Sequence, residues 1–191
     1  MTGRPARFAA WAAGAAAVAA GGYAGLVSGA LPLDVGLGRR VRPLGPQTLD
    51  IGVPRDLVFD VIAQPYLGRA TRAMREKVQV LERGSDMVLA AHFTPLGGSR
   101  FTAVTVETVR FTRPERVDFR LVRGPVPHVV EAFVLTERAE GTRLVYEGEL
   151  GTDLWRAGAW WGAKVAGRWE AAVAASLASV AAEAERRAAH R

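Results

Sequence analysis

Residues 142–180, TRLVYEGELGTDLWRAGAWWGAKVAGRWEAAVAASLASV, decide the fold of this chain. Their first part, 142–150, alternates apolar and polar side chains, which is typical of a half-buried strand. A helix then opens at Thr152 and Asp153, two residue types that cap helix N-termini. Its apolar side chains form one stripe at helical spacing. The stripe consists of Leu154, Gly158, Trp161, Val165, Trp169, Val173, Leu177 and Val180. We therefore expect a sheet to cover one face of this long helix.

Strand patterns fill much of the sequence before this unit. Each is a short alternating or β-branched run bounded by turn signals rich in Gly, Pro or Asp. The predicted strands are 77–82, 87–93, 101–111, 117–123, 128–136 and 142–150. Because parallel neighbours would need long crossovers, these short connections predict an antiparallel meander.

An earlier strand is predicted at 48–53, and two short helices are predicted after it. Pro54 suits the first position of a helix, because its φ angle is already fixed and its missing N–H is not needed there. We expect this helix to end before Pro65, since the residue preceding a proline disfavours helical geometry. The second short helix is predicted over 66–74.

The order of these elements and three short segments resemble one superfamily. The segments are 51–59 (IGVPRDLVF), 115–119 (ERVDF) and 141–144 (GTRL). The region from Gln47 to Glu185 is similar to the SRPBCC superfamily, also called START/polyketide cyclase-like or helix-grip proteins. The resemblance implies an α+β helix-grip fold, in which a curved antiparallel sheet of about seven strands wraps around a long C-terminal helix and two short helices follow the first strand.

The same resemblance implies a cavity between sheet and helix that holds sterols, lipids, polyketides or other apolar molecules, while the fold alone does not define the ligand. We expect both layers to line this cavity. The predicted ligand-binding residues are Leu89, Phe119, Glu131, Phe133 and Tyr146 from the strands and Trp161, Val165 and Trp169 from the helix. Small residues at Gly158, Gly162 and Ala166 favour unfilled space beside the helix. The alternative is that the large side chains fill the core.

Among the predicted site residues, Glu131 is the one that carries a carboxyl group able to exchange a proton. It shares a strand face with three apolar side chains, so it places a carboxylate in an apolar tunnel if that face lines the cavity. Burial would then raise its pKa. The alternative is that this face is convex and Glu131 is solvated. His128 is expected at the cavity rim or in a structural role, and His92, Glu147 and Glu149 are expected to be exposed.

The N-terminal segment is predicted to be a membrane helix. From Phe8 to Leu33 no side chain except that of Tyr23 is ionisable, and this run can span a hydrocarbon core of about 30 Å. A cleaved signal peptide is the main alternative, because residues 28–30 (SGA) form a small-residue cleavage pattern downstream of a basic start. A buried soluble helix is the third possibility.

Two features near this segment bear on partners. Glycines recur at four-residue spacing within it and would let two such helices approach closely and self-associate. These glycines are Gly21, Gly25 and Gly29. Residues 34–46 have turn chemistry and are predicted to be a linker, whose basic cluster rests on anionic headgroups or is simply solvated. The cluster consists of Arg39, Arg40 and Arg42.

The predicted organisation has three parts. Residues 1–33 form a transmembrane or signal segment, 34–46 a linker, and 47–191 the ligand-binding domain. We expect a single-pass membrane protein. Basic residues flank the hydrophobic segment on both sides, so the sequence leaves open which side of the membrane holds the domain.

The composition excludes several functional classes. The chain has no cysteine, which removes disulfides, thiolate catalysis and Cys-ligated zinc. Its three histidines lack metal-ligand spacing, and no GxSxG, P-loop or dinucleotide-binding pattern stands in its proper context, so we expect no metal and no cofactor. The formal net charge is +6, but the arginines are scattered among Asp and Glu, so we expect no nucleic-acid partner.

These observations predict a membrane-anchored carrier or sensor of an apolar small molecule of lipid, polyketide or isoprenoid type. A polyketide cyclase/aromatase-like enzyme or dehydratase is one alternative. It needs at least two convergent acid–base groups, for which the sequence offers only Glu131, Tyr146 and His128, and no catalytic residue is assigned. The other alternative is a scaffold domain whose cavity is filled by side chains.

Overall fold

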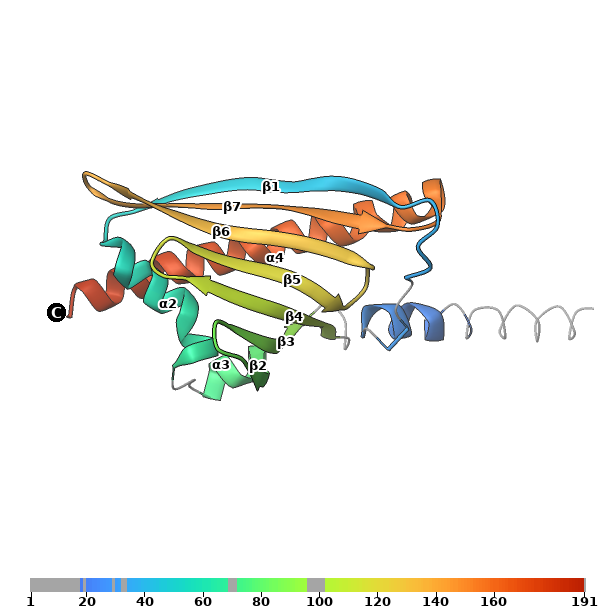
Figure 1. The fold of residues 1–191 in the computed structure, drawn as a ribbon, viewed down its shortest axis with the longest axis horizontal. Helices are drawn as coiled ribbons and strands as arrows, with labels where there is room; N and C mark the ends of the chain where they lie inside the picture. The colour runs from blue at the N-terminus through green and yellow to red at the C-terminus, as the bar shows by residue number, and fades with distance from the viewer. Residues whose placement is uncertain are drawn as a thin grey trace, which may run out of the picture.

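The computed structural model describes residues 18, 20–28, 30–31, 34–68, 72–95 and 102–190. A seven-stranded sheet lies along a long C-terminal helix, α4 (Trp155–Ala188), as Figure 1 shows. The spatial order of the strands is β1-β7-β6-β5-β4-β3-β2, and every neighbouring pair is antiparallel. The first strand therefore pairs with the last, and β2 to β7 form a meander.

The elements before α4 follow the predicted order. They are β1 (Arg40–Ile51), α2 (Arg55–Leu67), α3 (Arg72–Lys77), β2 (Val78–Arg83), β3 (Met87–Pro95), β4 (Thr102–Thr112), β5 (Arg116–Arg123), β6 (His128–Arg138) and β7 (Gly141–Thr152). The predicted α+β class, the antiparallel meander and the long C-terminal helix are confirmed. This is the helix-grip arrangement.

The first strand is longer than the sequence pattern predicts. Residues 34–46 carry the turn chemistry of a linker, yet β1 begins at Arg40 and stays paired with β7. The prolines and glycine that indicated a linker instead coincide with an irregularity, where the register shifts between Leu44 and Gln47. Gly45 has a φ of +76° there, and a Cβ on it would lie 2.9 Å from the Tyr146 carbonyl oxygen. Glycine therefore allows the two strands to stay close.

The first helix also continues past its predicted end. α2 includes Pro65 and ends at Leu67, so the prediction that it stops before Pro65 is wrong. Pro65 lies in the last turn, where a missing N–H and a steric clash disturb little of the helix. As a result Tyr66 belongs to α2, and its side chain is buried.

The start of α4 lacks the predicted side-chain cap. Thr152 belongs to β7, and the N-cap position is occupied by Leu154, which makes no side-chain cap bond. Leu154 and Trp155 have positive φ angles of 67° and 50°. Their backbone N–H groups donate to Leu37 at 2.8 Å and to Gly38 at 3.0 Å. The helix therefore begins against the segment that precedes β1.

Asp153 holds that preceding segment instead of capping the helix. Its carboxylate, of which 1% is exposed, accepts hydrogen bonds from the backbone N–H groups of Val35 at 2.8 Å and Gly36 at 2.7 Å. The same carboxylate accepts Nε–H of Arg39 at 2.7 Å. The Arg39 guanidinium lowers the pKa of Asp153 below its usual value, assisted by the two backbone donors. We call these four residues the Asp153 clasp.

The core lies between the concave face of the sheet, α2 and α4. Its fully buried large side chains include Phe59 of α2 and Leu144, Tyr146 and Leu150 of β7. From α4 it receives Ala166, Val173, Leu177 and Ala184.

Two glycines of α4 correct an expectation about empty space. A Cβ on Gly158 would lie 1.6 Å from the Asp153 carbonyl oxygen, and one on Gly162 would lie 2.9 Å from the Thr152 side chain. Small residues at these positions therefore permit close contact between α4 and the end of β7, and they do not border a void.

The predicted N-terminal membrane segment, 8–33, lies largely outside the described residues. Within the described part of the chain no helix is long and apolar enough to cross a membrane. Residues 20–27 are helical, and the Tyr23 ring lies edge-on to Trp161 with centroids 6.1 Å apart. Gly25 packs against the Leu31 side chain, Gly21 has open space around it, and Gly29 lies outside the described residues. Self-association through these glycines stays a prediction.

Candidate interior acid site

The concave face of the sheet carries two carboxyl groups on an otherwise largely apolar surface. Glu107 comes from β4 and Glu131 from β6, and their exposed fractions are 5% and 9%. Phe119 of β5 pairs with Glu131 on one side and with Val109 on the other, so these side chains share one face. The alternative that Glu131 lies on a convex, solvated face is therefore wrong.

Glu131 is held by donors from both layers of the fold. Its Oε2 accepts the hydroxyl of Tyr146 from β7 and the Nε1–H of Trp169 from α4, each at 2.7 Å. Gly148 lies opposite Glu131 in the ladder, and a Cβ there would come within 2.6 Å of the Glu131 Cβ. The glycine in β7 thus provides room for the acid. Both donors use Oε2, and neither uses Oε1.

Aromatic rings form a row beside this acid. The centroid distance is 5.8 Å between Tyr146 and Phe133, 5.3 Å between Phe133 and Phe119, and 6.2 Å between Phe119 and Tyr66. Edge-to-face contacts of this kind favour a rigid apolar wall. The row joins Glu131 to a second polar group.

The second polar cluster consists of Tyr66 from α2, His92 from β3 and Glu107 from β4. The Tyr66 hydroxyl lies 2.9 Å from His92 Nε2, and His92 Nδ1 lies 3.3 Å from Glu107 Oε2. Glu107 also accepts the Thr105 hydroxyl at 2.7 Å. His92 Nδ1 is buried and has no hydrogen-bond partner among the described residues. Tyr66, His92 and Glu107 therefore lie in a line, with a hydrogen bond between Tyr66 and His92 and a 3.3 Å approach between His92 and Glu107.

Burial shifts the pKa values of Glu131, Glu107 and His92 and so determines which of them carry a proton. It raises the pKa of Glu131 to about 7, and the charge of Glu107 adds to this effect. Burial likewise raises the pKa of Glu107 to about 7, against the opposing hydrogen bond from Thr105. It lowers the pKa of His92 to about 4, so this ring is neutral near neutral pH. The interior thus combines acids that can hold or release a proton with a neutral imidazole.

Most of the predicted ligand-binding residues lie around this site. On the concave face or touching Glu131 are Phe119, Glu131, Phe133, Tyr146 and Trp169. Val165 and Trp161 are half-buried on α4 and pack against the core. Trp161 also donates its Nε1–H to the Pro125 carbonyl at 2.8 Å, which ties α4 to the β5–β6 connection. Ligand binding by these residues stays a prediction.

The main error of the sequence analysis concerns β3, whose side chains were assigned to the wrong faces of the sheet. Leu89 pairs with Thr108, whereas His92 pairs with Thr105, whose hydroxyl reaches Glu107. Leu89 therefore lies on the opposite face from the interior site, and His92, predicted to be exposed, lies inside. Alternation separated the two sets of side chains correctly. It did not show which set faces the helix, and the more hydrophobic set of β3 faces outward.

Sequence reasoning also missed Glu107 and Tyr66. A signal for Glu107 was present, because it shares a strand face with Val109 and Phe111, as Glu131 does with its apolar neighbours. Tyr66 was assigned to the second helix because Pro65 was expected to end the first.

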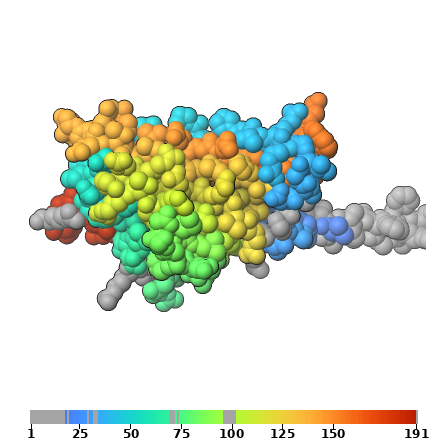
Figure 2. Space-filling view, in the orientation of Figure 1, coloured from blue at the N-terminus to red at the C-terminus, as the bar shows by residue number. Residues whose placement is uncertain are grey.

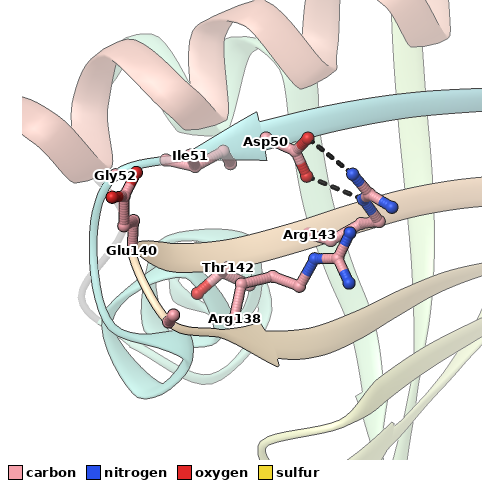
Figure 3. A pocket seen from close by; sticks show the side chains of 8 residues that line it. Asp50, Ile51, Gly52, Arg138, Glu140, Thr142 and Arg143 are labelled. Atoms are coloured by element: carbon pink, nitrogen blue, oxygen red, sulfur yellow. Dashed lines mark hydrogen bonds and ion pairs between the residues drawn. The ribbon is translucent and has the colours of Figure 1, made fainter.

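Polar features on the outer surface form no comparable site among the described residues. His128 Nε2 lies 2.8 Å from Glu149 Oε1, and Glu149 is half exposed. Figure 3 shows an open surface pocket at the β6–β7 hairpin, where Arg143 forms two hydrogen bonds to Asp50 at 2.7 and 2.8 Å. This pair is solvated, so the pocket offers a ligand no buried charged group.

Solved structures show the same fold at low sequence identity. The Zhui aromatase/cyclase from Streptomyces sp. R1128 is 18% identical, with a TM-score of 0.61, over 78% of this chain and 96% of that one. TTHA0849 from Thermus thermophilus is 16% identical, with a TM-score of 0.56, over 78% and 97%. Norcoclaurine synthase from Thalictrum flavum, in complex with dopamine and hydroxybenzaldehyde, is 11% identical, with a TM-score of 0.56, over 80% and 88%.

These likenesses establish the fold of the chain. No protein-family model matches the sequence, and no curated protein does either. Because unrelated activities recur on one fold, the function has to be argued from the interior site.

Proposed function

We propose that this helix-grip domain binds an apolar small molecule of lipid, polyketide or isoprenoid type between its sheet and α4, as a carrier or sensor at a membrane. The observation that carries the proposal is Glu131, a buried acid with a pKa raised to about 7 beside a row of aromatic rings. An oxygen atom of the ligand would bind at Oε1. The aromatic row would cover the apolar part of the molecule.

The cost of burying these groups supports a functional role. A buried carboxyl group destabilises a fold unless it is neutralised or fully hydrogen-bonded, so apolar residues would serve a purely structural core better. Buried groups with shifted pKa values concentrate at binding and catalytic sites. A neutral carboxylic acid can donate a hydrogen bond to a carbonyl or hydroxyl oxygen, which an ionised carboxylate cannot do.

The first test uses the substitution Val165→Trp on α4. The added ring would occupy the space proposed for the ligand, so we expect loss of binding of an apolar fluorescent probe, with a stability change within about 1 to 2 kcal/mol. Probe titration and urea unfolding measure the two effects. Val122→Trp, at an exposed position of β5, is the matched control and should retain binding.

One result would favour the scaffold alternative. If the wild type binds no probe and Val165→Trp costs several kcal/mol, the interior is already filled by side chains. Native mass spectrometry of the purified full chain should then find no retained small molecule.

A cyclase-like activity is the second candidate, and the line Tyr66–His92–Glu107 favours it. Together with Glu131 it supplies the convergent acid–base groups that the sequence alone did not reveal. Glu107 would remove a proton from a carbon beside a ligand carbonyl, while the protonated Glu131 would donate a hydrogen bond to that carbonyl oxygen. Cyclisation or dehydration of the bound molecule would follow from such a step.

Glu107→Gln separates the two candidates. If the domain is an enzyme, this change should slow conversion of a co-purified molecule by about 100-fold or more, because general acid–base catalysis contributes at least that factor. Affinity for the molecule should change little. Mass spectrometry before and after incubation measures conversion. If the wild type releases the molecule unchanged, the carrier function stands and the catalytic one does not.

A further inference from the structure

Exposed apolar side chains gather at the end of the molecule where α4 begins. Trp155 and Trp160 are 58% and 65% exposed, although tryptophan is usually well buried. Exposed aliphatic residues are also present in the segments that meet at this end, namely Val35, Leu37, Val41 and Leu154. In Figure 2 the start of β1 (blue) and the start of α4 (orange) lie at one end, opposite the C-terminal part of α4 (red).

The contacts of the described residues bring this surface together. The Asp153 clasp and the hydrogen bonds from Leu154 and Trp155 hold residues 35–39 against the first turn of α4. The Trp155 ring lies directly on Gly38, where a Cβ would come within 2.3 Å of it. Leu37, Leu154 and Trp155 therefore belong to one ordered surface, and Trp160 is exposed on the next turns of α4.

Cations predominate on this surface, and the exposed carboxylate of Asp34, next to Val35, is paired with Arg39. Residues 35–49 and 154–169 contain no Asp or Glu. Their cations are Arg39, Arg40, Arg42, Arg156, Lys164 and Arg168. The Lys164 ammonium lies 4.7 Å from the Trp160 ring centroid, which places a cation directly on an exposed indole. Asp153 beneath the surface is buried and is neutralised by Arg39.

We propose that this surface, the basic aromatic end, docks on an anionic lipid membrane. We define it by Val35, Leu37, Arg40, Val41, Arg42, Leu154, Trp155, Arg156, Trp160 and Lys164. Tryptophan favours the membrane interface, aliphatic side chains gain from contact with the acyl boundary, and basic residues are attracted to anionic headgroups. A nucleic acid would leave the aliphatic part of the surface without a partner.

The described helical residues 20–27 lie near the same end of the domain. Arg168 of α4 donates to the Tyr23 hydroxyl at 3.1 Å and the Tyr23 ring contacts Trp161, so the helical residues 20–27 lie beside the second to fourth turns of α4. A membrane that received the part of the predicted segment before residue 20 would therefore lie at the same end of the domain as the basic aromatic end. The proposal concerns orientation on the membrane and does not depend on the interior ligand.

The absence of cysteine allows a direct test on the full chain. Single substitutions Ala163→Cys, beside Lys164, and Ala139→Cys, at the β6–β7 hairpin, place one nitroxide label at each of two exposed positions. The label at position 163 should become several-fold less accessible to a water-soluble relaxing agent on vesicles of phosphatidylcholine with phosphatidylserine. The label at position 139 should not change. Pure phosphatidylcholine vesicles should give a smaller effect at position 163.

Charge reversal identifies the surface responsible. Adding Arg156→Glu and Lys164→Glu to the labelled chain should remove most of the protection at position 163, because each cation near an anionic surface contributes about fivefold to binding. Arg120→Glu, on the exposed part of β5, is the control and should leave the protection intact. Trp160→Ser gives a second route to the same loss if the charge-reversed chain does not fold.

Three outcomes would overturn the proposal. In the first, the full chain fails to float with anionic vesicles. In the second, the label at position 163 stays as accessible as the label at position 139. In the third, an RNA oligonucleotide protects position 163 and the vesicles do not, which would assign the surface to nucleic acid.

Discussion

The wild-type protein is expected to lose about 5 kcal/mol of unfolding free energy between about pH 5 and about pH 8, roughly half from each of two buried acids. Glu131 and Glu107 both have folded-state pKa values of about 7, above the ordinary value of 4.5. Between these two values the unfolded chain releases its protons while the folded chain retains them. The folded state is therefore favoured at low pH, and its advantage is lost as the pH rises towards 7.

Glu131→Gln should remove about half of this pH dependence. The amide has the shape of the acid and keeps an oxygen for Tyr146 and Trp169, but it does not titrate. Urea unfolding across the pH range measures the slope for wild type and variant. Glu147→Gln, an exposed carboxyl group on β7, should leave the slope unchanged. Equal slopes for all three proteins would mean that the interior acids are solvated in the folded state.

Asp153→Ala is expected to destabilise the fold by about 3 kcal/mol. The change leaves two backbone N–H groups and the Arg39 guanidinium without their acceptor in a site where the side chain is 1% exposed. It also frees the segment that supports the first turn of α4. Equilibrium unfolding in urea at neutral pH gives the size of the effect.

Asp34→Ala is the matched control for the clasp. Asp34 binds the same Arg39 guanidinium, but its side chain is 58% exposed, and exposed ion pairs contribute little. We expect a loss within about 0.5 kcal/mol. If the two substitutions cost the same, the buried carboxylate has no special role and the clasp does not stabilise the domain.

The fold could be predicted from periodicity because each element packs on one side. Alternation located β6 and β7, and the apolar stripe located α4, since burial of one face imposes those patterns. The errors lie where tertiary contacts outweigh local preference. Proline and glycine in 43–46 suggested a linker, but pairing with β7 extends the strand through them. Asp153 was predicted to cap the N-terminus of α4, but its carboxylate instead binds residues 35–39, which are distant in sequence.

The site could be predicted only in part, for a related reason. Glu131 was found because its strand neighbours are clearly apolar, so the acid stood out on its face. His92 was placed outside because Leu89 and Phe93, on the other face of β3, are the larger hydrophobic residues. The partnership of His92 with Tyr66 and Glu107 joins three elements, and no local pattern reveals it.

The pairing of β1 with β7 has a consequence for folding during synthesis on the ribosome. During synthesis β1 emerges first, yet its partner strand is the last to be made, and Val35 meets Asp153 across 118 residues. Such distant contacts slow folding and leave strand edges open to wrong partners. The nascent chain therefore cannot close its sheet or enclose its two interior acids before α4 begins to emerge. A chaperone that shields β1 during translation would be expected to raise the yield of folded protein.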